Sequence, residues 1–215
     1  MGLMDKFKEK LGLGTYTEQN KANITAIVKE INGYSQEFKK LSNLNEEEKE
    51  NIPKLIEENI RKRFETKKNK SPNEIIGKLE ILKNESFDIL NEIIPTEKEN
   101  FTIKTQEYRD KINNKLETIV KKELEENQKK SKDQRLSETK IREKVFIENK
   151  SSIINEIMPE AYALCKEATG LITGRYHYAV QLEAATAMSK NAIAHMKTGE
   201  GKTLVLTLVA YIDAL

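Results

Sequence analysis

The sequence contains no tryptophan, only four prolines and a single cysteine, and aromatic residues make up just 6% of it. The lone Cys165 cannot form an internal disulfide, which suits a reducing cytoplasm. No apolar run approaches the roughly 18 residues that a membrane-spanning helix needs. With breakers and aromatics scarce and 33% of residues charged, the composition favours long, solvated helices over a β-sandwich or barrel.

The charge balance excludes a strong electrostatic field, because the formal net charge is only +2. No bulk binding of nucleic acid is therefore expected. Residues 1–14 lack the apolar core and cleavage site of a secretory signal. On a helix, Leu3, Met4, Phe7 and Leu11 share one face. Such a segment either lies on an anionic membrane surface or docks as a short helix on the core, and both interpretations stay open.

Apolar residues at spacings of three and four predict an amphipathic helix over residues 17–44, weakened at Gly33. Asn45 is expected to cap a second helix, which runs to about residue 66, because acidic residues fill its first turn. A third helix is expected from Asn73 to Pro95.

Residues 103–130 are highly charged, with sparse apolar positions three, four and five residues apart. This spacing predicts an antiparallel helical hairpin or a short coiled coil, with its tip or hinge within residues 123–138. A dedicated partner-binding arm is the alternative interpretation of the same segment.

The proportion of charged residues falls after about residue 151, and alanine, leucine and isoleucine become more frequent. Pro159 is expected in the first turn of a helix that Gly170 or Gly174 closes. A further helix is expected over residues 178–189. The short apolar run at residues 192–196 predicts a buried strand.

A glycine-bearing loop at residues 197–201 then leads into a nearly all-apolar helix that begins at Lys202. Such a helix needs cover on most sides, as in an α/β core. The expected fold is therefore mainly α, with long helices and a helical hairpin, followed by the opening strand, P-loop and helix of an incomplete parallel α/β motor domain. With no neighbouring strands to cover it, the region after Ala192 is expected to be partly disordered or aggregation-prone on its own.

Gly201, Lys202 and Thr203 match the second half of the P-loop pattern, which grips nucleotide phosphates between a strand and a helix. Gly199 and Gly201 let backbone N–H groups approach phosphate oxygens. In this pattern the lysine bridges the β- and γ-phosphates and the threonine hydroxyl binds Mg²⁺. Met196 replaces the first glycine of the pattern.

The stretch "MKTGEGKT", preceded at a fixed distance by "YAVQL", resembles the SecA family of preprotein-export motor ATPases. "IMPEAYALCKEAT", "AIVKEINGYSQEFKKLS" and "LTLVAYIDAL" are also similar to family segments, and Met196 is the family's own residue. The resemblance covers about residues 153–215 and, more loosely, residues 17–42. It divides the chain into N-terminal helices (1–44), an inserted charged helical segment (45–136) and the start of the nucleotide-binding motor domain (137–215).

The resemblance implies a set of ATP-binding residues. Gln181 matches the glutamine that reads the adenine edge, for which an amide supplies both a donor and an acceptor. The phosphate loop would comprise Thr198, Gly199, Glu200, Gly201, Lys202 and Thr203, with Thr203 holding Mg²⁺ through its hydroxyl. Two positions depart from the family: Ala179 replaces an aspartate, and His195 replaces a glutamate.

The family also implies partners: a SecYEG-type translocon channel, preproteins and the cytoplasmic face of the plasma membrane, with a homodimer left open. Hydrolysis needs a Mg²⁺-binding carboxylate and an arginine for the γ-phosphate, which the family carries further downstream. The chain is thus expected to be a fragment without catalytic competence. Two other functions stay open: a helical protein-interaction module with a relic P-loop, and a fragment of a nucleic-acid helicase, which the near-neutral charge disfavours.

Overall fold

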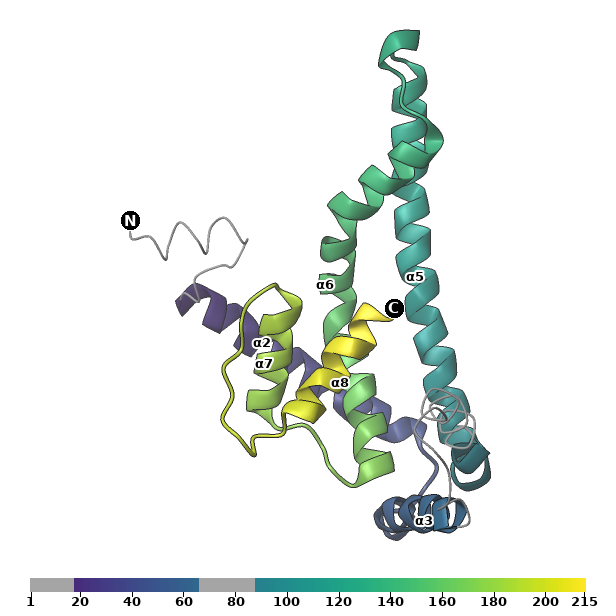
Figure 1. Ribbon diagram of the computed structural model, residues 1–215, viewed down its shortest axis with the longest axis vertical. Coiled ribbons are helices and arrows are strands. Elements are labelled where there is room, and N and C mark those ends of the chain that lie inside the picture. The colour runs from purple at the N-terminus through teal and green to yellow at the C-terminus, as the bar shows by residue number, and fades with distance from the viewer. Residues whose placement is uncertain (1–17, 66–87) are drawn as a thin grey trace.

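The computed structural model describes residues 18–65 and 88–215, and within these ranges the fold is helical (Figure 1). The elements in chain order are α2 (Glu18–Phe38), the short 3-10 helix η1 (Lys39–Leu41), α3 (Glu46–Glu65), α5 (Pro95–Gln128), η3 (Lys132–Gln134), α6 (Glu138–Thr173), α7 (Ala179–Ser189) and α8 (Lys202–Asp213). The mainly α expectation is confirmed. The amphipathic segment expected at residues 1–14, and most of the helix expected from Asn73, lie outside the described residues.

Local capping chemistry sets several helix ends where the sequence predicts them. Asn45 Oδ1 accepts the Glu48 backbone N–H at 2.9 Å, and Glu48 Oε2 accepts that of Asn45 at 2.7 Å, so the two residues form a capping box at the start of α3. Residues 88–93 are helical and stop before Pro95, which opens α5. Gly33, in contrast, does not interrupt α2.

Helix α6 is the central element of the fold and packs against α2, α3, α5 and α8. Its middle is buried on every side, from Ile157 through Leu164 with the exception of Glu160, which is half-buried. Toward α2, the Ser35 hydroxyl donates to the buried Glu167 carboxylate, and Lys166 Nζ donates to Asn32 Oδ1 at 2.8 Å. A helix that is apolar all round must be enclosed, so the other helices assemble around this segment.

The prediction that Pro159 begins a helix is wrong, because Pro159 lies inside α6, which starts at Glu138. A proline in a helix interior removes one backbone hydrogen bond and crowds the preceding turn. Ile153 and Ile157, on the N-terminal side of Pro159, are both buried in the main core. Packing on both sides of the proline therefore keeps the helix continuous where a local rule predicts a boundary.

Gly174 ends α6, one of the two glycines expected to do so. Its backbone is left-handed (φ 69°), and its N–H donates to the Gly170 carbonyl at 2.8 Å. Gly170 has a separate role, because a Cβ at that position would overlap the Tyr176 ring. The chain can therefore fold back over the end of α6 toward α7.

The predicted hairpin is present as an arm formed by α5 and the first half of α6, which projects from the core in Figure 1. Val120, Ile141 and Val145 form a buried apolar seam in its outer part. Ion pairs join the two helices, with 2.5 Å between Arg142 and Glu117 and 3.3 Å between Lys144 and Glu123. The seam carries most of the stability, since exposed ion pairs contribute little.

The tip of the arm is fixed by Asn127, which is 8% exposed. Its Nδ2 donates to the Leu136 carbonyl at 2.9 Å, and its Oδ1 accepts the Leu136 N–H at 3.0 Å. Arg135 adds hydrogen bonds to the carbonyls of Lys130 and Gln128 at the end of α5. Asn127 therefore attaches the connection, just before α6 begins, to the last turn of α5.

The strand predicted at residues 192–196 is wrong, and no strand occurs in the ranges that the structure describes. Burial does alternate as in a strand: Ala192, Ala194 and Met196 are half-buried, whereas Ile193 is 79% exposed. A strand is defined by hydrogen bonds to a neighbour, and no described segment pairs with this one. It is an irregular connection that has the side-chain alternation of a strand only.

Helix α8 packs on α6 and α7 through Val205, Leu208 and Ile212, while Leu206 on the opposite side is 53% exposed. One face is therefore covered by helices.

None of the described helices combines the length and hydropathy needed to span a bilayer.

Asn127→Ala is expected to destabilise the arm by about 1–3 kcal/mol, because it removes the two hydrogen bonds between the Asn127 side chain and the backbone of Leu136. Amide hydrogen exchange across residues 124–141 measures the effect. Asn113→Ala, an exposed change on the same helix, is the matched control. Equal protection of the tip in the two variants would contradict the role assigned to Asn127.

Candidate functional site

The loop at residues 197–201 is a tight turn that depends on glycine. Its backbone is left-handed at Gly199 (φ 90°) and Gly201 (φ 77°), a conformation that other residues rarely adopt. The Glu200 side chain folds back over the turn, and its Oε2 accepts the Lys197 N–H at 2.7 Å. The turn is thus held by its own residues.

Helix α8 begins directly after this turn, with Gly201 at the N-cap position and no side chain capping it. The Leu204 N–H donates to the Gly201 carbonyl at 2.9 Å. The N–H groups of Lys202 and Thr203 precede the first intrahelical hydrogen bond, and the side chains of both residues are exposed. An uncapped helix start with a free lysine is suited to an anion.

Gln181 lies against this turn, as the sequence predicts. It is 4% exposed, and its Nε2 donates to the Glu200 carbonyl at 2.9 Å. Its Oε1 accepts the Tyr178 N–H at 3.0 Å at the start of α7. A Cβ on Gly201 would overlap Gln181 Nε2. The amide therefore joins the beginning of α7 to the end of the glycine turn.

The remaining predicted positions are open to solvent or peripheral. Thr198, Gly199 and Glu200 are exposed on the turn. The two positions that depart from the expected pattern, Ala179 and His195, are exposed as well and are not buried against the site.

Sequence reasoning missed His177, which lies between α6 and α7 and is only 4% exposed. Its Nε2 is 2.8 Å from the Leu204 carbonyl in the first turn of α8. Nothing local in the sequence marks this residue, since its partner is 27 positions further along the chain. The nearby "YAVQL" motif is the only signal that directs attention to this corner.

Thiol and metal chemistry have little support in this region. Burial raises the pKa of the Cys165 thiol to about 11, so it stays protonated at neutral pH. Among the residues that the structure describes, no cluster of three or more histidine, cysteine or acidic side chains is arranged to hold a metal.

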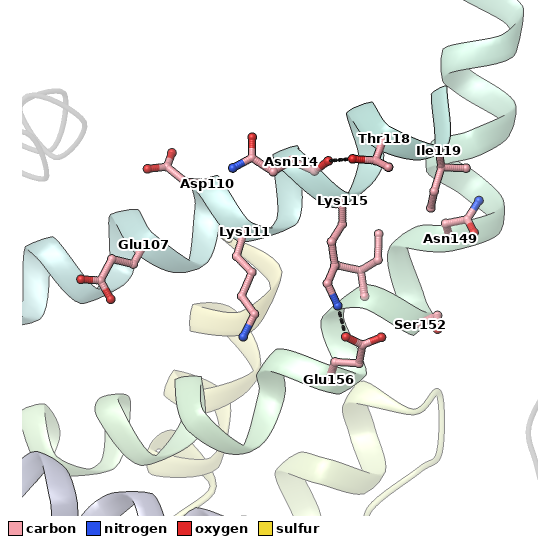
Figure 2. Close-up of a pocket in the computed structure, with 11 residues that line it drawn as sticks. Glu107, Asp110, Lys111, Asn114, Lys115, Thr118, Ile119, Asn149, Ser152 and Glu156 are labelled. Carbon is pink, nitrogen blue, oxygen red and sulfur yellow. Dashed lines mark hydrogen bonds and ion pairs between the residues drawn. The ribbon is translucent and has the colours of Figure 1, made fainter. Parts of the chain in front are cut away.

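A groove of about 750 Å³ lies elsewhere, between α5 and α6 (Figure 2). Lys111 and Lys115 extend across it from α5, and Lys115 forms an ion pair with Glu156 of α6, whereas Asp110 points away. The groove contains none of the residues of the glycine turn. Its mixed charges select no single class of ligand.

Comparisons with known proteins agree with the resemblance seen in the sequence. The chain is 42% identical over 103 residues to a protein translocase subunit SecA of Desulforamulus reducens, an alignment that covers 47% of this chain and 12% of the relative. It is 49% identical over 72 residues to the SecA subunit of Onion yellows phytoplasma, covering 34% and 8% of the two chains. The chain therefore spans only about a tenth of the length of these curated relatives.

No solved structure matches the chain. The family model of the SecA DEAD-like domain matches residues 97–215, a range that holds all but the first two residues of α5, the whole of α6 and the glycine turn. The match begins inside the segment 45–136 that the sequence assigns to an insertion. Since the matched range is more than half of the sequence, the chain belongs to the SecA family through its DEAD-like domain.

Proposed function

We propose that the chain binds ATP with Mg²⁺ at residues 198–203 and forms part of a motor for protein export. The observation that carries the proposal is the uncapped start of α8, which follows two left-handed glycines and lies beside Gln181. Backbone N–H groups, the positive end of a helix dipole and a lysine side chain all belong to this helix start, and this combination supports binding of a phosphate chain.

Each residue has a definite role in this proposal. The N–H groups of the turn bind phosphate oxygens, and Lys202 neutralises charge on the β- and γ-phosphates. Thr203 supplies a hydroxyl to Mg²⁺, whose other ligands are phosphate oxygens and water, in keeping with the preference of Mg²⁺ for substrate phosphates. This arrangement needs no cluster of acidic ligands on the protein.

Gln181 can serve the adenine base although its amide already binds the backbone. A carboxamide has two N–H groups and two acceptor lone pairs, of which the contacts to Glu200 and Tyr178 use one each. The remaining donor and acceptor match the edge of adenine. Reading the base and holding the turn then depend on the same side chain.

The partners follow from the family rather than from a surface of this chain. The relatives are named as protein translocase subunits. We therefore propose that the protein acts peripherally at the cytoplasmic face of the membrane, with a translocon channel and preproteins as partners. No nucleic acid partner is proposed.

Lys202→Ala is expected to lower affinity for ATP and Mg²⁺ by about 10- to 100-fold, the cost of losing a charge-assisted contact of roughly 1.5–3 kcal/mol. Calorimetric titration of the purified full chain measures it, with circular dichroism to verify folding. Lys197→Ala changes a lysine of the same loop outside the motif and is expected to bind normally. Equal affinity in wild type and Lys202→Ala would contradict the proposal and show that the loop does not bind the nucleotide.

A pair of glycine variants tests the geometry of the turn. Gly201→Ala and Gly199→Ala both strain a left-handed residue, at about 1 kcal/mol or more. Only the Gly201 variant also pushes a Cβ onto Gln181, because nothing lies within 4 Å of a Cβ at Gly199. We expect a lower melting temperature and weaker nucleotide binding for Gly201→Ala than for Gly199→Ala. The reverse order would contradict the contact between Gln181 and the turn.

A further inference from the structure

His177 stands at a junction between the two parts of the candidate site. It is the last residue before Tyr178, the N-cap of α7, and it comes shortly after Gly174 ends α6. Although it lies in a connecting segment, it is 4% exposed, as deeply buried as Gln181. A buried histidine in a connection is held by specific contacts.

Its hydrogen bonding fixes which nitrogen carries the proton. Nε2 is 2.8 Å from the Leu204 carbonyl, which can only accept, so Nε2 is the N–H donor. The Thr207 hydroxyl donates to the same carbonyl at 2.7 Å, and its oxygen is 3.4 Å from Nε2. His177 thereby reaches the first turn of α8 from outside that helix.

The contacts of His177 and Gln181 lie on either side of Gly201, Lys202 and Thr203, the second half of the predicted phosphate loop. Gln181 holds the carbonyl of Glu200, immediately before Gly201, and His177 holds the carbonyl of Leu204, immediately after Thr203. Both side chains come from the same five residues at the start of α7. The orientation of the intervening N–H groups is therefore fixed from both ends by one short segment.

We propose that His177 is a positioning residue. Together with Gln181, it clamps residues 201–203, where the glycine turn joins α8, in the conformation that receives phosphate. The proposal rests on the nucleotide site proposed above. His177 does not contact the nucleotide in this role; it acts through the backbone of α8.

The clamp depends on a neutral imidazole. His177 Nδ1 is buried and has no hydrogen-bond partner, so a second proton would be placed where nothing accepts it. Burial lowers the pKa of His177 below its usual 6.5 and outweighs the hydrogen bond to the Leu204 carbonyl, which raises it; Lys166 of α6 disfavours the cation further. The groups that face the ring from α8, Leu204 and Thr207, are uncharged.

Lowering the pH is expected to weaken the clamp, because the pKa of His177 is lowered in the folded protein. Because the folded pKa is depressed, the contribution of His177 is fully present above about pH 6.5 and is lost as pH falls toward the folded pKa. Charging the ring leaves the Nε2–H bond to Leu204 possible but places an unpaired N–H at the buried Nδ1, which favours local opening of this corner. At acidic pH, the first turn of α8 is therefore expected to open at a higher pH than the one at which the core unfolds.

Three variants separate positioning from simple packing. His177→Phe keeps an aromatic ring without a donor, whereas His177→Gln keeps an N–H donor without a titration. We expect about tenfold weaker binding of ATP and Mg²⁺ for His177→Phe at pH 7.5, and less than threefold for His177→Gln. His195→Gln, which changes the only other histidine and an exposed one, is the matched control and should equal wild type.

The pH profile gives a readout that packing alone would not change. Between pH 7.5 and 5.5, wild type is expected to lose affinity more steeply than His177→Gln. Both proteins meet the same protonation of the nucleotide phosphates, so the difference between them isolates His177. Parallel profiles, or wild-type affinity in His177→Phe, would overturn the proposal.

Nuclear magnetic resonance of the imidazole nitrogens and amide exchange in α8 decide the question without any nucleotide. We expect His177 to be the Nε2–H tautomer with a pKa below the usual histidine value, and exchange at residues 204–208 to accelerate in His177→Phe but not in His177→Gln. If both expectations are met but wild type does not bind ATP, the proposed function is wrong and the clamp stands. A protonated Nδ1, or equal exchange in both variants, would remove the clamp alone.

Discussion

The need to enclose the middle of α6 determines the rest of the structure. A helical segment that is apolar on all sides cannot face water, so α2, α5, α7 and α8 pack around it. Tyr162 shows how this reaches the candidate site: it is fully buried in α6, and its hydroxyl is 2.6 Å from that of Ser189 in α7. The place of α7, and hence of His177 and Gln181, is a consequence of burying α6.

Features set by neighbouring residues could be predicted from the sequence. The cap at Asn45, the left-handed Gly174 and the start of α8 at Lys202 depend on contacts within about four positions of the chain. The contact between Gln181 and the turn spans 19 residues and was expected only because a family resemblance supplied the spacing. Without that resemblance, a glutamine on a helix carries no signal.

Features that depend on distant packing could not be predicted. Pro159 indicates a helix start by a local rule, but the buried residues before and after it keep α6 continuous. Residues 192–196 have the composition and alternation of a strand, but a strand exists only through a neighbour. His177 belongs to the same class, since its role is defined by a carbonyl on another helix.

The continuity of α6 has a mechanical consequence. A helix of 36 residues extends about 54 Å along its axis, although α6 bends in the arm (Figure 1). One end of α6 forms the projecting arm, its middle is enclosed by the core, and its other end leads through Gly174 into α7, which precedes the glycine turn. A force on the arm is therefore transmitted along one unbroken helix through the core to the residues that lead into α7.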